Sequence, residues 1–167
     1  WSSDVCSSDL ELLVHFRPER QTVLMTDASS YVMGAVLSQI VDEQGTERPV
    51  CFMSKTLDRC QSHYTVTEKE CLAIVWATEQ LRYLLQGQLF TLETDHEALR
   101  YLLHNKEAVG RMARWAMKLQ QFDMVVRYRK GEENGAADFV SRLHEMPDGT
   151  YEVRTIHALD RSEEHTS

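Results

Sequence analysis

The chain has 167 residues, of which 43% are hydrophobic and 26% charged, and its formal net charge at pH 7 is −8. A domain of about 150 residues buries roughly 68 to 70% of its unfolded surface, so this length and composition predict one compact domain with a real core. The sequence holds no apolar run of about 18 residues and no recognisable signal peptide, so neither a membrane span nor secretion is predicted.

Both ends of the sequence differ in character from its middle. Residues 1–10 (WSSDVCSSDL) and 161–167 (RSEEHTS) are hydrophilic and aperiodic, and both correspond to translations of a common sequencing adapter. We therefore interpret them as adapter-derived artefacts and leave them out of fold reasoning. Without their four acids and one arginine the net charge is −5. This modest acidity does not exclude a nucleic-acid partner, because two bound divalent ions would offset four clustered carboxylates.

Outside these tails the cysteines are Cys51, Cys60 and Cys71, an odd number without a CxxC pair. This pattern favours reduced thiols, and with them a cytoplasmic protein.

Three β-rich stretches open the middle of the chain at residues 22–26, 31–40 and 48–55. Short polar turns separate them, so they predict three antiparallel strands. Gly34 stands inside the second strand, where a glycine indicates a β-bulge or a close approach of the backbone to a neighbouring strand or a ligand. We favour a structural explanation for it.

The next segment predicts a long helix that begins at Thr65 and runs to Gln86. Thr65 and Glu68 have the spacing of a capping box, and Gly87 is a typical C-terminal stop. Four apolar residues repeat at the spacing of a buried helix face, and Glu70 lies on the same line one turn earlier. Its carboxylate is therefore expected to point at the sheet. The apolar residues are Ile74, Ala77, Leu81 and Leu84.

The remaining pattern alternates strands and helices. A strand is predicted at 89–94, a short helix at 97–104, a helix at 111–121, a strand at 123–129 and a last helix at 136–143. The order predicts an α/β domain over residues 21–144, with a five-stranded mixed sheet of three antiparallel and then two parallel strands flanked by helices. Residues 145–160 read as a tail or linker.

Four acidic residues stand where apolar segments meet turns or helices: Asp27, Glu70, Asp95 and Asp138. Each alone has an ordinary explanation, as a turn residue, a solvated helix residue, a helix cap or a helix-dipole partner. Asp27 and Asp95, however, follow strands expected to be parallel neighbours, whose carboxyl ends are where α/β sheets place ligands. Converging carboxylates repel one another unless cations hold them together, so the set predicts a site for divalent ions.

Six ordered blocks carry a specific resemblance over residues 17–143. They are TDASSYVMGAVLSQ, RPVCFMSKTL, HYTVTEKECLAIVWATEQLRYLLQG, LETDHEALRYLL, RWAMKLQQFDMVVRYRKG and AADFVSRL. Together they resemble the ribonuclease H domain of gypsy-class long-terminal-repeat retrotransposon polyproteins, a domain with the ribonuclease H-like fold. All four acids of that family have counterparts here, at Asp27, Glu70, Asp95 and Asp138.

The resemblance implies an endonuclease that hydrolyses the RNA strand of RNA/DNA hybrids during reverse transcription. It implies two Mg²⁺ ions, for which Mn²⁺ can substitute, about 3.5 to 4 Å apart and held by the four acids. By the same analogy Asp27 bridges the ions, Glu70 and Asp95 hold the first, and Asp138 helps to hold the second. A polymerase domain of the same polyprotein would precede, with residues 11–20 as its connection, and the protein would work in cytoplasmic virus-like particles.

Substrate contacts implied by the resemblance fall on Ser29 and Ser30 in the first hairpin and Thr67 at the helix start. Arg111, with Arg114 and Trp115, could add a basic and aromatic phosphate surface. The alternative for this helix is that Trp115 belongs to the core and the arginines form a solvated face.

Two other functions fit the same sequence. A catalytically silent ribonuclease H-like module would only support a polymerase, although an intact self-repelling acid cluster argues against it. A related metal nuclease or strand-transfer enzyme would act on DNA alone, although the EKECLA helix block favours hybrid cleavage.

Overall fold

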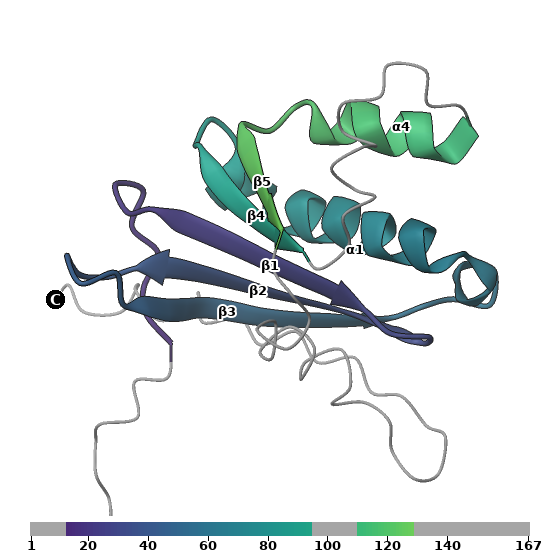
Figure 1. The fold of residues 1–167 in the computed structure, drawn as a ribbon, viewed down its shortest axis with the longest axis horizontal. Coiled ribbons are helices and arrows are strands. Elements are labelled where there is room, and N and C mark those ends of the chain that lie inside the picture. The colour runs from purple at the N-terminus through teal and green to yellow at the C-terminus, as the bar shows by residue number, and fades with distance from the viewer. Residues whose placement is uncertain (1–12, 95–109, 129–167) are drawn as a thin grey trace, which may run out of the picture.

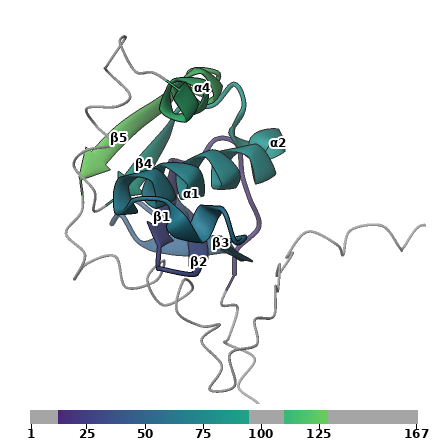
Figure 2. The ribbon, with the colours of Figure 1, turned by 90° about the vertical axis from the view of Figure 1, so that its right-hand side faces the viewer.

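The computed structural model describes residues 13–94 and 110–128, which form a five-stranded sheet with α1 and α4 on the same side of it (Figures 1 and 2). The elements in chain order are β1 (Thr22–Ala28), β2 (Val32–Ile40), β3 (Glu47–Thr56), the short 3-10 helix η1 (Gln61–His63), α1 (Val66–Gln80), α2 (Arg82–Leu85), β4 (Phe90–Thr94), α4 (Gly110–Leu119) and β5 (Met124–Tyr128).

The strand order β3-β2-β1-β4-β5 confirms the predicted sheet. β1, β2 and β3 pair antiparallel, whereas β1 pairs with β4 and β4 with β5 in parallel. Each parallel pair is joined by a segment that contains a helix, as parallel pairing requires. Because β1 and β4 are parallel neighbours, their carboxyl ends lie at the same edge of the sheet (Figure 1).

Of the explanations offered for Gly34, a bulge or a close approach of the backbone, the structure excludes the bulge, which lies elsewhere in β2. Gly34 occupies a regular ladder position, with Asp27 as its Cα partner on one side and Ser54 on the other. The register between β2 and β3 shifts instead between Leu37 and Ser38, where Ser38 faces Pro49. Proline has no N–H to donate to a ladder and is tolerated at bulges and edges, so Pro49 accounts for the position of the irregularity.

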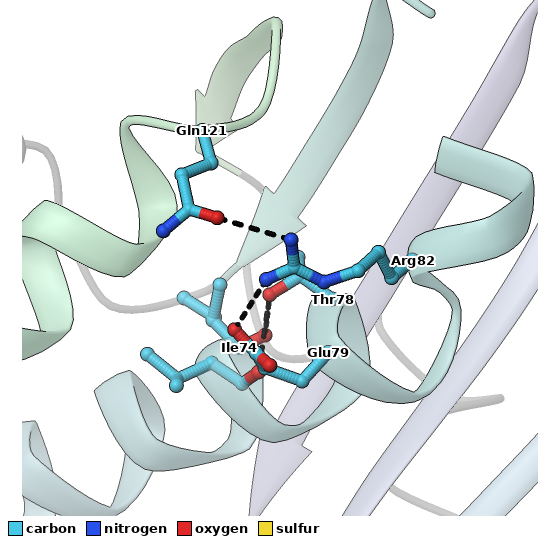
Figure 3. Close-up of polar contacts among 6 residues, drawn as sticks. Ile74, Thr78, Glu79, Arg82 and Gln121 are labelled. Atoms are coloured by element: carbon cyan, nitrogen blue, oxygen red, sulfur yellow. Dashed lines mark hydrogen bonds and ion pairs between the residues drawn. The ribbon is translucent and has the colours of Figure 1, made fainter. Parts of the chain in front are cut away.

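The single helix expected from Thr65 to Gln86 is two helices, because the chain leaves helical geometry at Leu81, with φ −96° and ψ 13°. One turn earlier the Thr78 hydroxyl donates to the carbonyls of Ile74 and Val75, at 2.9 and 3.1 Å (Figure 3). Such bonds from a threonine to the preceding turn bend helices. Gly87, at φ 77°, follows α2 as the predicted stop.

Arg82 holds this bend against the end of α4. Its guanidinium donates to Glu79 Oε1 at 2.9 Å and to Gln121 Oε1 at 3.0 Å (Figure 3), and it lies 5.4 Å from the centre of the Phe122 ring. Arg82 therefore joins α1 and α2 to the turn between α4 and β5.

The main core lies between α1 and the sheet. Ile74, Ala77 and Leu81 are buried as the helix stripe predicted, and they pack against strand residues such as Leu24 and Leu92. Trp115 on α4 is partly buried against the same core. Trp115 thus packs against the core from its border and is not one of the buried core residues.

Residues 13–20 pack onto the domain before β1 begins. Val14 and Phe16 contact the main core, and the Val14 amide donates to the Pro49 carbonyl at 2.8 Å. The fully buried Gln39 side chain accepts from the Arg17 amide at 2.9 Å and donates to the Arg17 carbonyl at 2.8 Å. This segment, predicted as part of a connection from a polymerase, thus belongs to the packed unit.

The predicted helices 97–104 and 136–143, the tail 145–160 and both adapter-like ends lie outside the described residues. In the part of the chain that is described, no helix is both long and apolar enough to cross a membrane.

Candidate active site

The Glu70 carboxylate lies against the backbone beside Asp27, at the carboxyl end of β1. Asp27 is half-buried near the end of that strand, and Glu70, 3% exposed, projects from the second turn of α1. Glu70 Oε1 accepts a hydrogen bond from the backbone amide of Ala28 at 3.3 Å. That amide nitrogen is bonded to the carbonyl carbon of Asp27, so the Glu70 carboxylate lies against the Asp27–Ala28 peptide.

Three features of α1 hold Glu70 in this place. The capping box predicted from Thr65 and Glu68 is present and fixes where the helix begins. The buried stripe that starts at Ile74 turns the Glu70 face toward β1 and β2. At the surface, Lys69 Nζ donates to the Ser30 carbonyl at 3.1 Å and ties the helix to the hairpin that follows Asp27.

The other two predicted acids, Asp95 and Asp138, lie outside the described residues. Asp95 is the next residue in the chain after Thr94, which is 2% exposed and ends β4 beside β1. Within residues 13–94 and 110–128, no three histidine, cysteine or acidic side chains gather into a metal site. Two of the four predicted ligands belong to this range, and the structure places the Glu70 carboxylate against the backbone of the Asp27–Ala28 peptide.

The hairpin serines differ in their contacts. The Ser29 hydroxyl accepts from the Val32 amide and donates to the Val32 carbonyl, both at 3.0 Å, so it closes the turn between β1 and β2. Ser30 is exposed on the same turn, and Thr67 is half-buried in the first turn of α1. The hydrogen bonds of Ser29 explain its presence in the turn on structural grounds. Substrate contact by Ser29, Ser30 and Thr67 stays a prediction.

Arg111 lines a cleft of about 540 Å³ at the amino end of α1. Its Nε lies 3.5 Å from Glu68 Oε1, and its guanidinium stacks 4.0 Å from the centre of the Tyr64 ring. Tyr64 in turn lies 6.0 Å from the Trp115 ring, which links α4 to the residues before α1. The cleft is lined by Arg59, Cys60, His63, Tyr64, Glu68 and Arg111.

Sequence reasoning missed Arg59, His63 and Tyr64. Their position in the sequence could have identified them, because the stretch immediately before a capping box borders the amino end of the helix. Basic residues there, with a helix amino end, favour an anion.

Comparisons with known proteins address the family. A family model described as "RNase H-like domain found in reverse transcriptase" matches residues 17–122, which is more than half of the chain. The chain belongs to this family. Together with the transposon polyproteins that the chain resembles, this match confirms the predicted likeness to retrotransposon ribonuclease H domains.

Relatives of this RNase H-like domain are parts of long polyproteins. It is 42% identical over 125 residues to the retrovirus-related Pol polyprotein from transposon 297 of Drosophila melanogaster, covering 75% of this chain and 11% of the polyprotein. It is 35% identical over 142 residues to the transposon Tf2-3 polyprotein of Schizosaccharomyces pombe, covering 83% of this chain and 11% of that one. The chain therefore spans about a tenth of the length of these relatives.

Solved structures share the fold of the RNase H-like domain. A foamy viral protease-reverse transcriptase in complex with an RNA/DNA hybrid matches with a TM-score of 0.56 and 16% identity, over 93% of this chain and 19% of that one. LC11-RNase H1 in complex with an RNA/DNA hybrid matches with a TM-score of 0.54 and 18% identity, over 72% of this chain and 93% of that one. Both confirm the ribonuclease H-like architecture.

Glu68 is the acid in the cleft of the RNase H-like domain. The hydrogen bond from the Thr65 amide lowers the pKa of Glu68 below its ordinary value of 4.5; the Thr65 hydroxyl and the Arg111 charge add to the effect, and burial opposes it. A carboxyl whose pKa is lowered by folding stabilises the folded state above its unfolded pKa and loses that contribution as pH falls through its folded pKa.

We therefore expect Glu68→Gln to weaken the dependence of the free energy of unfolding on pH at acidic pH. The free energy of unfolding of the unmodified protein should fall more steeply than that of the variant as pH drops from about 5 to below 4.5. Urea denaturation at a series of pH values measures both curves. The control is Glu43→Gln in the exposed turn between β2 and β3, which should keep the steep dependence on pH. Parallel curves for Glu68→Gln and the unmodified protein would contradict the assigned role.

Proposed function

We propose that this domain is a metal-dependent endonuclease that hydrolyses the RNA strand of RNA/DNA hybrids during retrotransposon reverse transcription. The observation that carries the proposal is the contact of Glu70 with the Asp27–Ala28 peptide. It places the carboxylate of Glu70 beside the backbone of Asp27, which is far from it in the sequence, at the carboxyl end of a central strand, where α/β sheets place ligands.

The donor set fits magnesium. Carboxylate oxygens suit Mg²⁺ and Mn²⁺, whereas zinc favours nitrogen and sulfur ligands, and the buried Cys51 and Cys71 lie in the main core. Asp27, Glu70, Asp95 and Asp138 would hold two ions. When bound, the ions activate the attacking water and stabilise the charge that develops on the phosphate and leaving oxygens.

The chain's own contribution is to hold these carboxylates in place. Burial of Glu70 and its hydrogen bond to the Ala28 amide restrict the rotamers of this side chain. Thr94, which precedes Asp95 in the sequence, ends β4 at the edge of the sheet where the parallel neighbour β1 also ends, and this supports including Asp95 in the proposal. Lys69 fixes the hairpin with Ser30 beside them.

The cleft at the start of α1 supports binding of a nucleic-acid backbone. Arg59, His63 and Arg111 line it, and the Tyr64 ring and Glu68 orient the Arg111 guanidinium. We assign the cleft, with Ser30 and Thr67 on the neighbouring surface, to one strand of the hybrid. In this proposal a polymerase domain of the same polyprotein is the partner, and the site of action is the cytoplasmic virus-like particle.

A cleavage assay tests the proposal. The protein is incubated with an end-labelled RNA/DNA hybrid, double-stranded RNA or double-stranded DNA, in Mg²⁺ and in chelator. We expect cleavage of the RNA strand of the hybrid alone, in Mg²⁺ alone. Cleavage of double-stranded DNA would indicate a DNA nuclease instead, and intact substrates in every lane would favour the silent structural module.

A further inference from the structure

The outward surface of α4 carries an uninterrupted basic strip, defined as Arg111, Arg114 and Lys118. These are the charged residues of α4, which contains no acid, although the whole chain has a net charge of −8. The strip is therefore a positively charged region on a protein whose net charge is negative.

Helical geometry places the three side chains in one row. Residues three, four and seven apart lie on the same helix face, and the core side of α4 is occupied by Met112, Trp115 and Leu119. Arg114 and Lys118 are exposed, whereas Arg111 is half-buried. The strip thus runs along the helix beside the core-facing stripe.

The strip begins in the cleft. Arg111 lines the cleft beside Glu68, and Arg114 and Lys118 follow at one and two turns along α4. Seven residues of helix rise about 10 Å. Among the described residues, no ion pair of Arg114 or Lys118 is present, while Arg111 faces Glu68. Positive charge is thereby presented in line from the cleft outward.

We propose that this strip binds the sugar-phosphate backbone of the nucleic-acid substrate where the backbone leaves the cleft, an inference that rests on the proposed function. A rise of about 10 Å corresponds to about three base-pair steps of 3.4 Å, so each of the three cationic side chains can meet a different phosphate of one strand. Continuity with the cleft favours a regular row of phosphates over an acidic peptide. Such contacts position the substrate without reading its sequence.

The test compares two double variants with the same change of charge. Arg114→Gln with Lys118→Gln removes the exposed part of the strip. Arg17→Gln with Arg20→Gln removes two positive charges from the segment before β1, at the opposite end of that strand from Asp27. Binding to a fluorescent RNA/DNA hybrid is measured by anisotropy over a range of salt concentrations, in chelator so that cleavage plays no part.

The strip variant should bind more weakly at low salt. Its plot of log Kobs against log salt concentration should be shallower by up to about 0.9 for each phosphate that the strip no longer neutralises, a total of about 2, and the control should keep the original slope. An unchanged slope in the strip variant, or an equal loss of affinity in both variants, would overturn the proposal. Equally tight binding of a polyglutamate peptide through the strip would overturn the choice of a nucleic acid.

The two proposals fail in different ways. Because binding is read without cleavage, an unmodified protein that fails to cut any hybrid would remove the proposed function while the salt slopes still report on the strip. Conversely, normal cleavage by the unmodified protein with an unchanged salt slope in the strip variant would support the proposed nuclease function and contradict the proposed role of the strip.

Discussion

Replacing Phe90 by alanine is expected to lower the free energy of unfolding by about 3 to 5 kcal/mol, the scale for truncating a buried phenylalanine. Phe90 is 2% exposed at the start of β4, and its ring meets the Phe122 ring edge-on, with centroids 6.4 Å apart. The cavity would open where β4 meets the turn between α4 and β5, which also receives Arg82. Urea denaturation followed by circular dichroism gives the value.

The adjacent residue supplies the control for this cavity. Leu89 is 69% exposed, so Leu89→Ala should change the free energy of unfolding by no more than about 0.5 kcal/mol. A cost below about 1 kcal/mol for Phe90→Ala, or equal costs for the two variants, would show that the described packing of β4 is wrong.

The largest effect on activity is expected from Asp27→Asn and Glu70→Gln. Each should lower hybrid cleavage by more than about 100-fold, because losing outer partners of a metal site alone costs about 10- to 100-fold. Both substitutions keep the size of the side chain and remove one negative charge. In metal-free buffer Asp27→Asn should fold at least as stably as the unmodified protein, because it relieves repulsion from Glu70.

A matched substitution separates the site from a general effect of charge. Asp42 accepts a hydrogen bond from the Thr46 amide at 2.8 Å in the turn between β2 and β3. Asp42→Asn makes the same chemical change there and should leave hybrid cleavage at the original rate. Marked unfolding of Asp27→Asn in metal-free buffer, or full cleavage by Glu70→Gln, would contradict the paired-acid account.

The sheet and the place of Glu70 could be predicted because both follow from local pattern. The apolar run of residues 22–26 becomes a strand, and the stripe from Ile74 to Leu81 sets which face of α1 is buried. Glu70 stands on that stripe, so its direction followed from helical periodicity alone. The register shift between Leu37 and Ser38 could also have been predicted, but from Pro49 on the facing strand and not from Gly34.

Other features depend on contacts between distant segments. The break between α1 and α2 at Leu81 involves the hydrogen bond of the Thr78 hydroxyl to the preceding turn and that of Arg82 to Gln121. Helix propensity alone does not predict these contacts. The stacking of Arg111 on Tyr64 likewise joins α4 to the residues before α1. The hydrogen bonds by which the Ser29 hydroxyl closes the hairpin also depend on the turn geometry, and they leave its predicted contact with substrate untested.

The central claim is that side chains far apart in the sequence share divalent ions at the carboxyl ends of β1 and β4. Addition of a small amount of Mn²⁺ to isotope-labelled protein tests it most directly, because a paramagnetic ion broadens the NMR signals of nearby amides. We predict that the amides of Ala28, Glu70 and Thr94 broaden first, that those of the turn around Asp42 stay sharp, and that Asp27→Asn abolishes this selectivity. Broadening that spares Ala28 and Glu70, or that is unchanged in Asp27→Asn, would contradict the account.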